Sequence, residues 1–267
     1  MIELQRSVKL IVNPRGEGAG SNGHAGRPSM VGLGRQYQMD AVCAGTPDAD
    51  TGYLIGIQEI DRAVRQRALP VLTAACRERP ETEPWALVGE LAEAVARGVP
   101  VPLRRLRLRL TPTYSVEVEM DSRTRVGPAA LVRQRFEFAA AHRLHADALS
   151  DDENRRVFGK CNNPSGHGHN YEVEVAVEIP TGETRLSLHG LETLVDRVLI
   201  DPFDHTHLNE DTEAFSAETG VIPSVENIAR VFFERLAGPT EAELEGARLR
   251  SVTVWETPRT SATFPAS

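Results

Sequence analysis

Residues 158–171 read FGKCNNPSGHGHNY, and the interpretation of the whole chain starts from this stretch. It contains two histidines, His167 and His169, separated by one residue, and a thiol, Cys161, six residues before the first of them. Successive side chains of a strand point to opposite faces, so the two imidazoles would share one face. Two imidazoles on one face can hold a metal ion, but among eight histidines such a pair arises easily by chance. Its meaning therefore depends on the residues that accompany it.

The composition excludes several classes of protein. The chain has 267 residues, a formal net charge of −8, and no apolar run near the roughly 20 residues that cross a bilayer. An acidic chain of this kind is not expected to bind nucleic acid or an anionic membrane. Its N-terminus lacks the basic and then apolar layout of a signal peptide. Its cysteines are odd in number and scattered, as is typical of free thiols: Cys43, Cys76 and Cys161. We therefore expect a cytoplasmic protein.

Hydrophobic periodicity predicts two similar series of strands and helices. In the first half, strands are expected over residues 7–13, 35–45, 103–110 and 116–118, and helices over residues 55–69 and 85–96. In the second half, strands are expected over residues 135–141, 171–179 and 249–255, and helices over residues 186–200 and 225–236. Ser224 is a suitable N-cap for the last helix. Residues 121–133, which contain a Gly-Pro pair, are predicted to be a linker.

Two segments of the first half match nucleotide-binding patterns only superficially. The alternation of arginine with leucine would place Arg105, Arg107 and Arg109 on one face of a strand. No aromatic residues interleave them, so we expect a solvated or cross-strand-paired face rather than a nucleic-acid site. Residues 18–23 match the spacing of a dinucleotide-binding fingerprint, but the residues that follow cannot open the helix that the fingerprint requires. A loop is expected there.

The two halves are copies of one unit. Residues 32–37, GLGRQY, match residues 166–171, GHGHNY, at both glycines and the tyrosine. A four-stranded unit alone leaves open sheet edges, so the strands are expected to close a shared barrel. We predict an α+β fold of two tandem units, each β-β-α-α-β-β, whose antiparallel strands form a barrel on oligomerisation. The first unit is expected over residues 1–120 and the second over residues 134–267.

The second half carries further residues suited to chemistry. A third histidine, His142, ends its first strand, and three histidines with an open fourth position describe a catalytic zinc site. Cys161 beside a cation could form a reactive thiolate. Asp204 beside His205 can move protons, and Glu256 ends the last strand. Taken singly, each also has a structural interpretation: a strand-end histidine, a buried thiol, a surface turn or a solvated acid.

Together these residues resemble the 6-pyruvoyl-tetrahydropterin synthase family, which contains the related 6-carboxy-tetrahydropterin synthases. The resemblance covers essentially all of residues 134–260, and its motifs keep the order and spacing of the family. They are FxAxHRL at 138–144, FGKCNNP at 158–164, GHGHNY at 166–171, DHxxLN at 204–209, ENIA at 226–229 and ET at 256–257.

The resemblance implies a tunnelling fold (T-fold) and a carbon–oxygen lyase acting on phosphates. The implied reaction converts 7,8-dihydroneopterin triphosphate to 6-pyruvoyl-tetrahydropterin with elimination of triphosphate, with Mg²⁺ accompanying the substrate. Cys161 would remove a proton as a thiolate, and His205, oriented by Asp204, would relay protons. The implied zinc ligands are His142, His167 and His169. The implied substrate-binding residues are Glu256, which would bind the guanidine-like edge of the pterin, Glu226 and Ser224.

Two alternatives remain open at this point. The first is the 6-carboxy-5,6,7,8-tetrahydropterin synthase reaction of queuosine biosynthesis. The five residues between Cys161 and His167 favour the pyruvoyl product, because carboxypterin synthases often have a shorter gap. The second alternative, from another class, is a non-catalytic pterin-binding or scaffold protein.

The first half resembles the same fold without the metal-binding and catalytic residues of the second half. Leu33 and Arg35 stand where the second half has its histidine pair, and Leu110 stands near the position of Glu256. We expect this half to complete the barrel without a zinc site. Because the family typically assembles from six units, a two-unit chain is expected to be a homo-oligomer, either a trimer or a hexamer.

Overall fold

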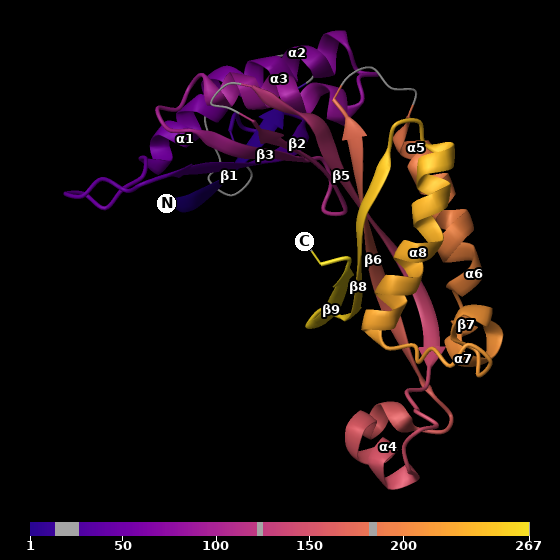
Figure 1. Cartoon of the computed structure of the whole chain (residues 1–267). Coiled ribbons are helices and arrows are strands. Elements are labelled where there is room, and N and C mark those ends of the chain that lie inside the picture. Colours follow the sequence, from indigo (N-terminus) through magenta and orange to yellow (C-terminus); the bar gives the residue numbers. More distant parts are fainter. Residues whose placement is uncertain (14–26, 122–124, 182–185, 267) are drawn as a thin grey trace. The chain divides into compact units, whose positions relative to one another are not determined.

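The computed structural model of the chain describes residues 1–13, 27–121, 125–181 and 186–266 (Figure 1). The chain divides into two compact units: Met1–Arg133 with Glu178–Thr184, and Gln134–Val177 with Arg185–Ser267. Both units combine antiparallel strands with helices, which confirms the predicted α+β class. The glycine-rich residues 18–23, where a loop was expected, lie outside the described part of the chain.

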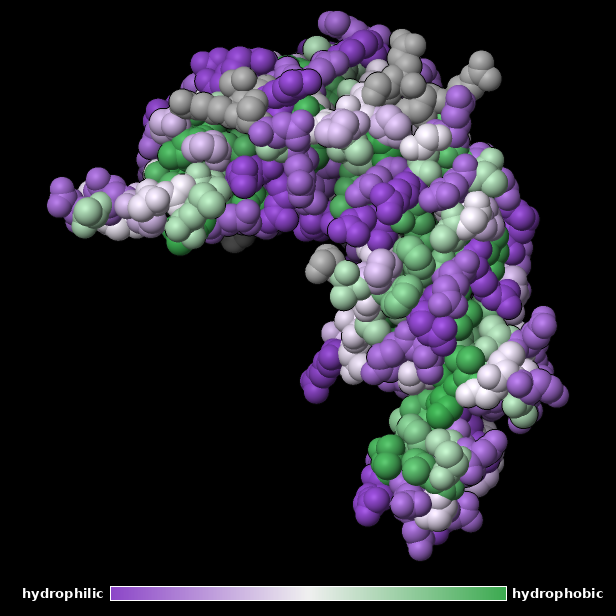
Figure 2. Space-filling model, viewed as in Figure 1, coloured by the Kyte–Doolittle hydropathy of each residue, from purple (hydrophilic) through white to green (hydrophobic). Residues whose placement is uncertain are grey.

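The first unit is a sheet covered on one face by helices. Its strands pair antiparallel in the order β1 (Ile2–Val12), β2 (Arg35–Gly45), β3 (Leu103–Arg109) and β4 (Tyr114–Met120). Its helices are α1 (Ile57–Ala63), α2 (Leu69–Glu78) and α3 (Pro84–Ala96), and a π-helical segment, Val64–Ala68, joins α1 to α2. The helices lie across the sheet in Figure 1, and hydrophilic side chains cover the outer side of α2 in Figure 2. Leu106 and Leu108 of β3 are buried, as the alternation predicts.

The opposite face of β3 carries the arginine stripe, and each arginine pairs with an acid on another strand. Arg107 lies 2.8 Å from Glu117 of β4, and Arg105 lies 2.9 Å from Glu3 of β1. Arg109 lies 2.7 Å from Asp40 of β2. These contacts confirm the cross-strand-paired interpretation of the stripe.

The strands of the second unit follow the order β5 (Val126–His142), β6 (His167–Pro180), β8 (Arg248–Thr257) and β9 (Thr260–Phe264), with β5 starting in the first unit. A two-residue strand, β7 (Thr206–His207), pairs parallel with β5 through Ala140↔Thr206 and Ala141↔His207. The end of β5 and the start of β6 meet at one end of the sheet, where His142 Nε2 lies 3.2 Å from His167 Nε2. That end carries the residues singled out by the sequence.

The helices of the second unit are α4 (Asp151–Phe158), α5 (Leu188–Val195), α6 (Asp201–Phe203), α7 (Leu208–Asp211) and α8 (Val225–Glu243). The helix predicted over residues 186–200 is α5 continued by a π-helical segment, Asp196–Ile200. Ser224 caps α8, because its side chain accepts a hydrogen bond from Asn227 N at 3.4 Å. In Figure 2, hydrophilic side chains line the exposed side of α8. Within the described ranges, we find no helix that is long and apolar enough to cross a bilayer.

The aromatic core of the second unit holds α8 against the sheet. Phe232 of α8 lies with its ring centroid 5.4 Å from Phe138 of β5 and 4.8 Å from Phe203 of α6. Phe138 stacks on Tyr171 of β6 with centroids 4.8 Å apart. All four side chains are almost fully buried. This packing fixes the strand ends that carry the candidate site.

The predicted linker over residues 121–133 is largely a strand. β5 begins at Val126, so it covers most of that segment, and residues 122–124 are not described. Ala130 and Val132 alternate with less buried neighbours and are themselves fully buried, which is the pattern of a half-buried strand. The Gly-Pro pair marks the start of this strand, a position that tolerates proline.

Candidate metal centre and its surroundings

Three histidines meet at one end of the second unit's sheet. His142 is the last residue of β5, His167 is the first residue of β6, and His169 follows two positions later. One ring nitrogen from each lies within 4.8 Å of the others, and the group could hold a metal ion. His142 Nε2 and His167 Nε2 are 3.2 Å apart. The same-face geometry expected of His167 and His169 therefore holds, with His142 joining them.

The protonation of His142 is fixed by the backbone. Its Nδ1 donates a hydrogen bond of 2.7 Å to the carbonyl oxygen of Pro223, which leaves the lone pair of Nε2 facing the other histidines. The side chain is fully buried, and burial lowers its pKa to about 4, with the neighbouring imidazoles acting in the same direction. Burial also lowers the pKa of His169. Neutral imidazoles are the form that binds metals.

Unpartnered polar atoms support a metal at this position. His169 Nε2 and His167 Nδ1 are buried without a hydrogen-bond partner, and an unsatisfied buried nitrogen is costly. A cation held by the ring nitrogens would satisfy His169 Nε2. Three imidazole donors suit zinc and other first-row transition metals and do not suit calcium or magnesium, which prefer oxygen ligands. The residues therefore fit the metal that the sequence predicts.

Glu256 lies against this centre. It is near the end of β8, and its Oε1 is 3.5 Å from His142 Nε2 and 3.7 Å from His169 Nε2. Its side chain is 18% exposed, so the carboxylate keeps a path to solvent. A negative charge at this distance favours a cation among the three imidazoles. A ligand that binds this carboxylate would thus lie directly beside the metal position.

Cys161 lies on a short 3₁₀ turn, Gly159–Asn162, which follows α4. Its side chain is partly buried. Burial raises the pKa of the Cys161 thiol, and the negative charge of Glu256 raises it further. A raised pKa disfavours the thiolate form of Cys161.

Asp204 and His205 form a hydrogen-bonded pair at the edge of β5. Asp204 Oδ1 accepts a hydrogen bond from Ala139 N at 2.8 Å, and its Oδ2 lies 2.7 Å from His205 Nδ1. The hydrogen bonds from the Ala139 backbone and from His205 lower the pKa of Asp204. His205 has a positive φ of 56° and a side chain that is 82% exposed. Among the described residues, no hydrogen bond joins this pair to Cys161.

The other two residues predicted to bind substrate lie at the start of α8. Ser224 is the N-cap, so its hydroxyl oxygen is engaged by the helix, although its proton remains available to a ligand. Glu226 is exposed on the first turn.

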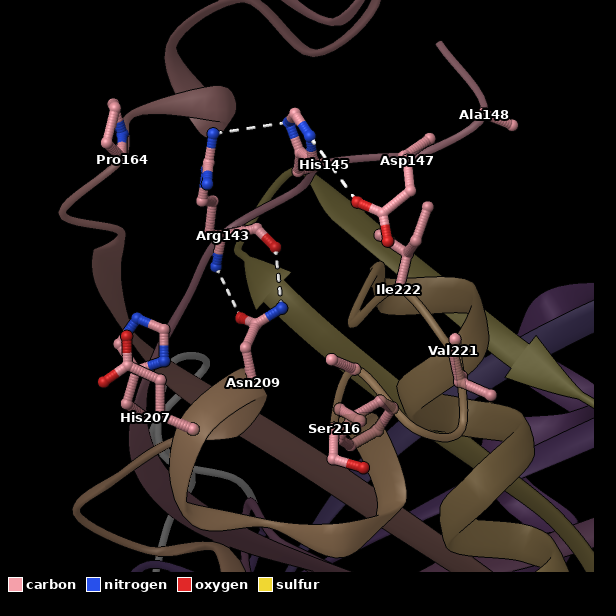
Figure 3. A pocket seen from close by; sticks show the side chains of 15 residues that line it. Arg143, His145, Asp147, Ala148, Pro164, His207, Asn209, Ser216, Val221 and Ile222 are labelled. Carbon is pink, nitrogen blue, oxygen red and sulfur yellow. Dashed lines mark hydrogen bonds and ion pairs between the residues drawn. The ribbon is translucent and has the colours of Figure 1, made fainter.

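A pocket of about 560 Å³ opens beside this region in the second unit (Figure 3). Polar residues on its wall include Arg143, His145 and Asn209. The motif at 138–144 drew attention to Arg143, but sequence reasoning gave no role to His145. It also missed the Pro223 carbonyl that orients His142, because a backbone acceptor leaves no trace in residue identity.

Fold and site together define an α+β protein with a three-histidine centre suited to a transition metal, with a carboxylate and a thiol nearby. A model of the family described as 6-pyruvoyl tetrahydropterin synthase matches residues 131–267. The chain belongs to this family.

Individual relatives agree with the match. The chain is 41% identical over 110 residues to the 6-pyruvoyl tetrahydrobiopterin synthase of Poecilia reticulata, an alignment covering 40% of this chain and 73% of that protein. It is also 41% identical over 110 residues to the protein of that name from Homo sapiens, covering 40% and 74%. A solved structure of Caenorhabditis elegans 6-pyruvoyl tetrahydropterin synthase is 37% identical, covers 52% of this chain and 97% of that chain, and has a TM-score of 0.46.

Proposed function

We propose that this protein is a zinc-dependent 6-pyruvoyl-tetrahydropterin synthase. It would convert 7,8-dihydroneopterin triphosphate to 6-pyruvoyl-tetrahydropterin and release inorganic triphosphate. The observation that carries the proposal is the cluster of three imidazoles, with Glu256 against it and Cys161 within reach of the charge of Glu256, in a chain that shares its family with synthases of this name. A binding or scaffold protein would have no need of a partly buried thiol at such a centre.

The metal site is proposed to hold zinc through His142, His167 and His169. The hydrogen bond from His142 Nδ1 to Pro223 supports this assignment, because it presents Nε2 as a ready ligand. When bound, zinc supplies a Lewis acid that makes the C–H bonds of the substrate side chain easier to deprotonate.

Cys161 is proposed as the base that takes a proton from the substrate side chain. The charge of Glu256 raises its pKa in the free protein, which opposes formation of the thiolate. Glu256 is also the residue proposed to accept two hydrogen bonds from the guanidine-like edge of the pterin. Those hydrogen bonds would disperse the negative charge of the Glu256 carboxylate and so weaken its effect on Cys161. Substrate binding would therefore make the thiol easier to ionise.

Asp204 and His205 are proposed to move the second proton. Asp204 accepts hydrogen bonds from both Ala139 N and His205, so it holds the imidazole in one orientation. The His205 imidazole is largely exposed, so it is accessible to a substrate that enters the site from solvent. The hydroxyl proton of Ser224 and the carboxylate of Glu226 are proposed as further contacts to the pterin.

The proposal extends to the first unit and to assembly. We propose that the first unit is a tunnelling-fold copy without a metal site and that the chain forms a homo-oligomer, a trimer or a hexamer, whose strands close a barrel. In the described ranges, the only group of histidines, cysteines or acids that could hold a metal is the one in the second unit.

Mg²⁺ is proposed to accompany the triphosphate. The free cysteines of the described residues suit the reducing cytoplasm proposed for the protein.

Two matched cysteine variants test the proposal. Release of inorganic triphosphate from 7,8-dihydroneopterin triphosphate should fall by about 10³-fold or more in Cys161→Ala, because loss of a catalytic base typically costs 10²–10⁴-fold. Cys76→Ala, which changes a half-buried thiol of the first unit, should keep the parental rate. Equal rates in both variants would remove Cys161 from the mechanism.

A further inference from the structure

The residues that follow His142 hold the turn that carries Cys161. Leu144 N donates a hydrogen bond of 2.9 Å to Cys161 O. In return, Asn162 Nδ2 donates one of 2.8 Å to Leu144 O, and Arg143 Nε donates one of 3.4 Å to Asn162 O. The 3₁₀ turn is therefore fastened to the end of β5, although the two segments are almost 20 residues apart in the chain.

The imidazole of His145 adds side-chain hydrogen bonds to this network. Its Nδ1 lies 3.0 Å from Asn162 Nδ2 and 3.3 Å from Arg143 Nη2. Figure 3 shows the Arg143 guanidinium pointing at the His145 ring. A guanidinium and an amide NH₂ can only donate, so Nδ1 of His145 must be the acceptor and its proton must sit on Nε2. The imidazole is thus an acceptor for two donors.

Asn162 is the link between His145 and the thiol. It is 7% exposed, and its Nδ2 uses its two protons on Leu144 O and His145 Nδ1. Removing the acceptor at His145 would leave a buried N–H unsatisfied, a costly state that favours movement of the turn. Within the described residues, the Cys161 side chain makes no hydrogen bond of its own. The position of its sulfur therefore depends on the backbone of this turn.

We propose that His145 is a positioning residue: its Nδ1 holds Asn162, and thereby holds the Cys161 thiol against the metal centre. This inference rests on the proposed role of Cys161 as the base. The brace joins His145, three residues after the metal ligand His142, to Asn162, the residue after the thiol, so it fixes the two reacting groups relative to each other. A displacement of about 1 Å in such a geometry can cost about 10²-fold in rate.

The test compares two changes at His145 with a matched histidine elsewhere. His145→Leu removes the acceptor, whereas His145→Asn can place Oδ1 near the position of Nδ1 and keep it. His189→Leu is the control, because His189 is exposed on α5. Each full-length, zinc-loaded protein is treated with iodoacetamide, and the alkylation rate of each cysteine is measured by peptide mass spectrometry. kcat and KM for 7,8-dihydroneopterin triphosphate are measured in parallel.

We expect His145→Leu to lower kcat by about 10- to 100-fold with little change in KM, because the base is displaced but the pterin contacts remain. Alkylation of Cys161 should become severalfold faster, because the freed turn exposes the thiol. Cys43 is fully buried, and its rate should stay unchanged. His145→Asn should restore both readouts to near the parental values, and His189→Leu should match the parent.

Either of two results would overturn the proposal. Cys161 alkylated at the parental rate in His145→Leu would show that the imidazole does not hold the turn. A parallel rise for Cys43 and Cys161, without rescue by His145→Asn, would show general loosening in place of positioning. The alkylation rates are measured without substrate, so they test the role of His145 independently of turnover. If the parent protein did not convert this pterin, that result would count against the proposed function and not against the role of His145.

Discussion

His142 and Pro223 are 81 residues apart, and a 2.7 Å hydrogen bond from His142 Nδ1 to the Pro223 carbonyl joins them. The bond connects the end of β5 to the residue before the N-cap of α8. It fixes the tautomer of a fully buried imidazole and turns the lone pair of Nε2 toward His167. Orientation of a ligand by a second hydrogen bond is a common device of metal sites. The metal centre is thus built into the packing of the second unit.

Metal content should depend on this cluster alone. The parent protein is expected to bind one zinc ion per chain, and His167→Ala should lose it on dialysis, because removal of an outer partner alone already costs about 10–100-fold in affinity. His189→Ala should retain it. Zinc per chain is measured by elemental analysis of gel-filtered protein. Two zinc ions in the parent would contradict a first unit without a metal site.

Gly166 is required by the geometry around the first histidine of β6. Its φ is +66°, and a Cβ there would lie 2.7 Å from His207 Nε2 and 3.0 Å from the backbone oxygen of His142. Gly166→Ala should therefore cost more stability than the roughly 1–2 kcal/mol of left-handed strain, and it should weaken zinc binding. Gly220→Ala is the matched control, since Gly220 has a φ of +65° and no atom near its added Cβ.

Denaturant unfolding and zinc titration of the two glycine variants distinguish the cost of the left-handed backbone from the steric clash of the added Cβ at Gly166. Gly220→Ala should show only the strain and keep the parental zinc affinity. If both variants lost the same stability and both bound zinc normally, the close approach at Gly166 would have no consequence for the site.

The arginine stripe of β3 and its acidic partners should make the stability of the first unit depend on pH. Burial raises the pKa of Asp40, but hydrogen bonds from Ser7, Arg109 and Gln38 outweigh it and lower the pKa overall. A carboxyl with a lowered folded pKa contributes stability above its unfolded value of about 3.9, and this is lost as pH falls through the folded pKa. Asp40→Asn should therefore reduce the free energy of unfolding at pH 7 by about 1–3 kcal/mol.

The same variant should flatten the loss of stability below about pH 4. Denaturant unfolding at several pH values between 7 and 3 measures both effects. Asp50→Asn, which changes an exposed turn residue, is the control and should follow the parental curve. A parental pH profile in Asp40→Asn would show that the Asp40 network does not stabilise the folded state.

The sequence predicted the elements that carry strong periodicity. Residues 35–45 and 103–110 alternate over most of their length, and the structure has β2 and β3 there. Helix α4 was missed because its eight residues are mostly charged and bury only Asn154, so it has no apolar stripe to detect. A capping box, Ser150 with Glu153, was the available signal for its start.

The site was less completely predictable than the fold. The spacing of His167 and His169 placed both rings on one face, and the motif supplied His142, so the cluster itself could be predicted. The approach of Glu256 to two of these rings could not, because it depends on which strand neighbours β6. The brace from His145 to Asn162 depends on loop geometry and had no sequence signal.

Identification of the product tests the central claim most directly. The zinc-loaded full-length chain is incubated with 7,8-dihydroneopterin triphosphate and Mg²⁺, and the pterin product is identified by mass spectrometry. We predict 6-pyruvoyl-tetrahydropterin together with inorganic triphosphate, formed about 10³-fold or more slowly by Cys161→Ala. A 6-carboxy-tetrahydropterin with released acetaldehyde, or no conversion despite one bound zinc ion per chain, would contradict the proposed function.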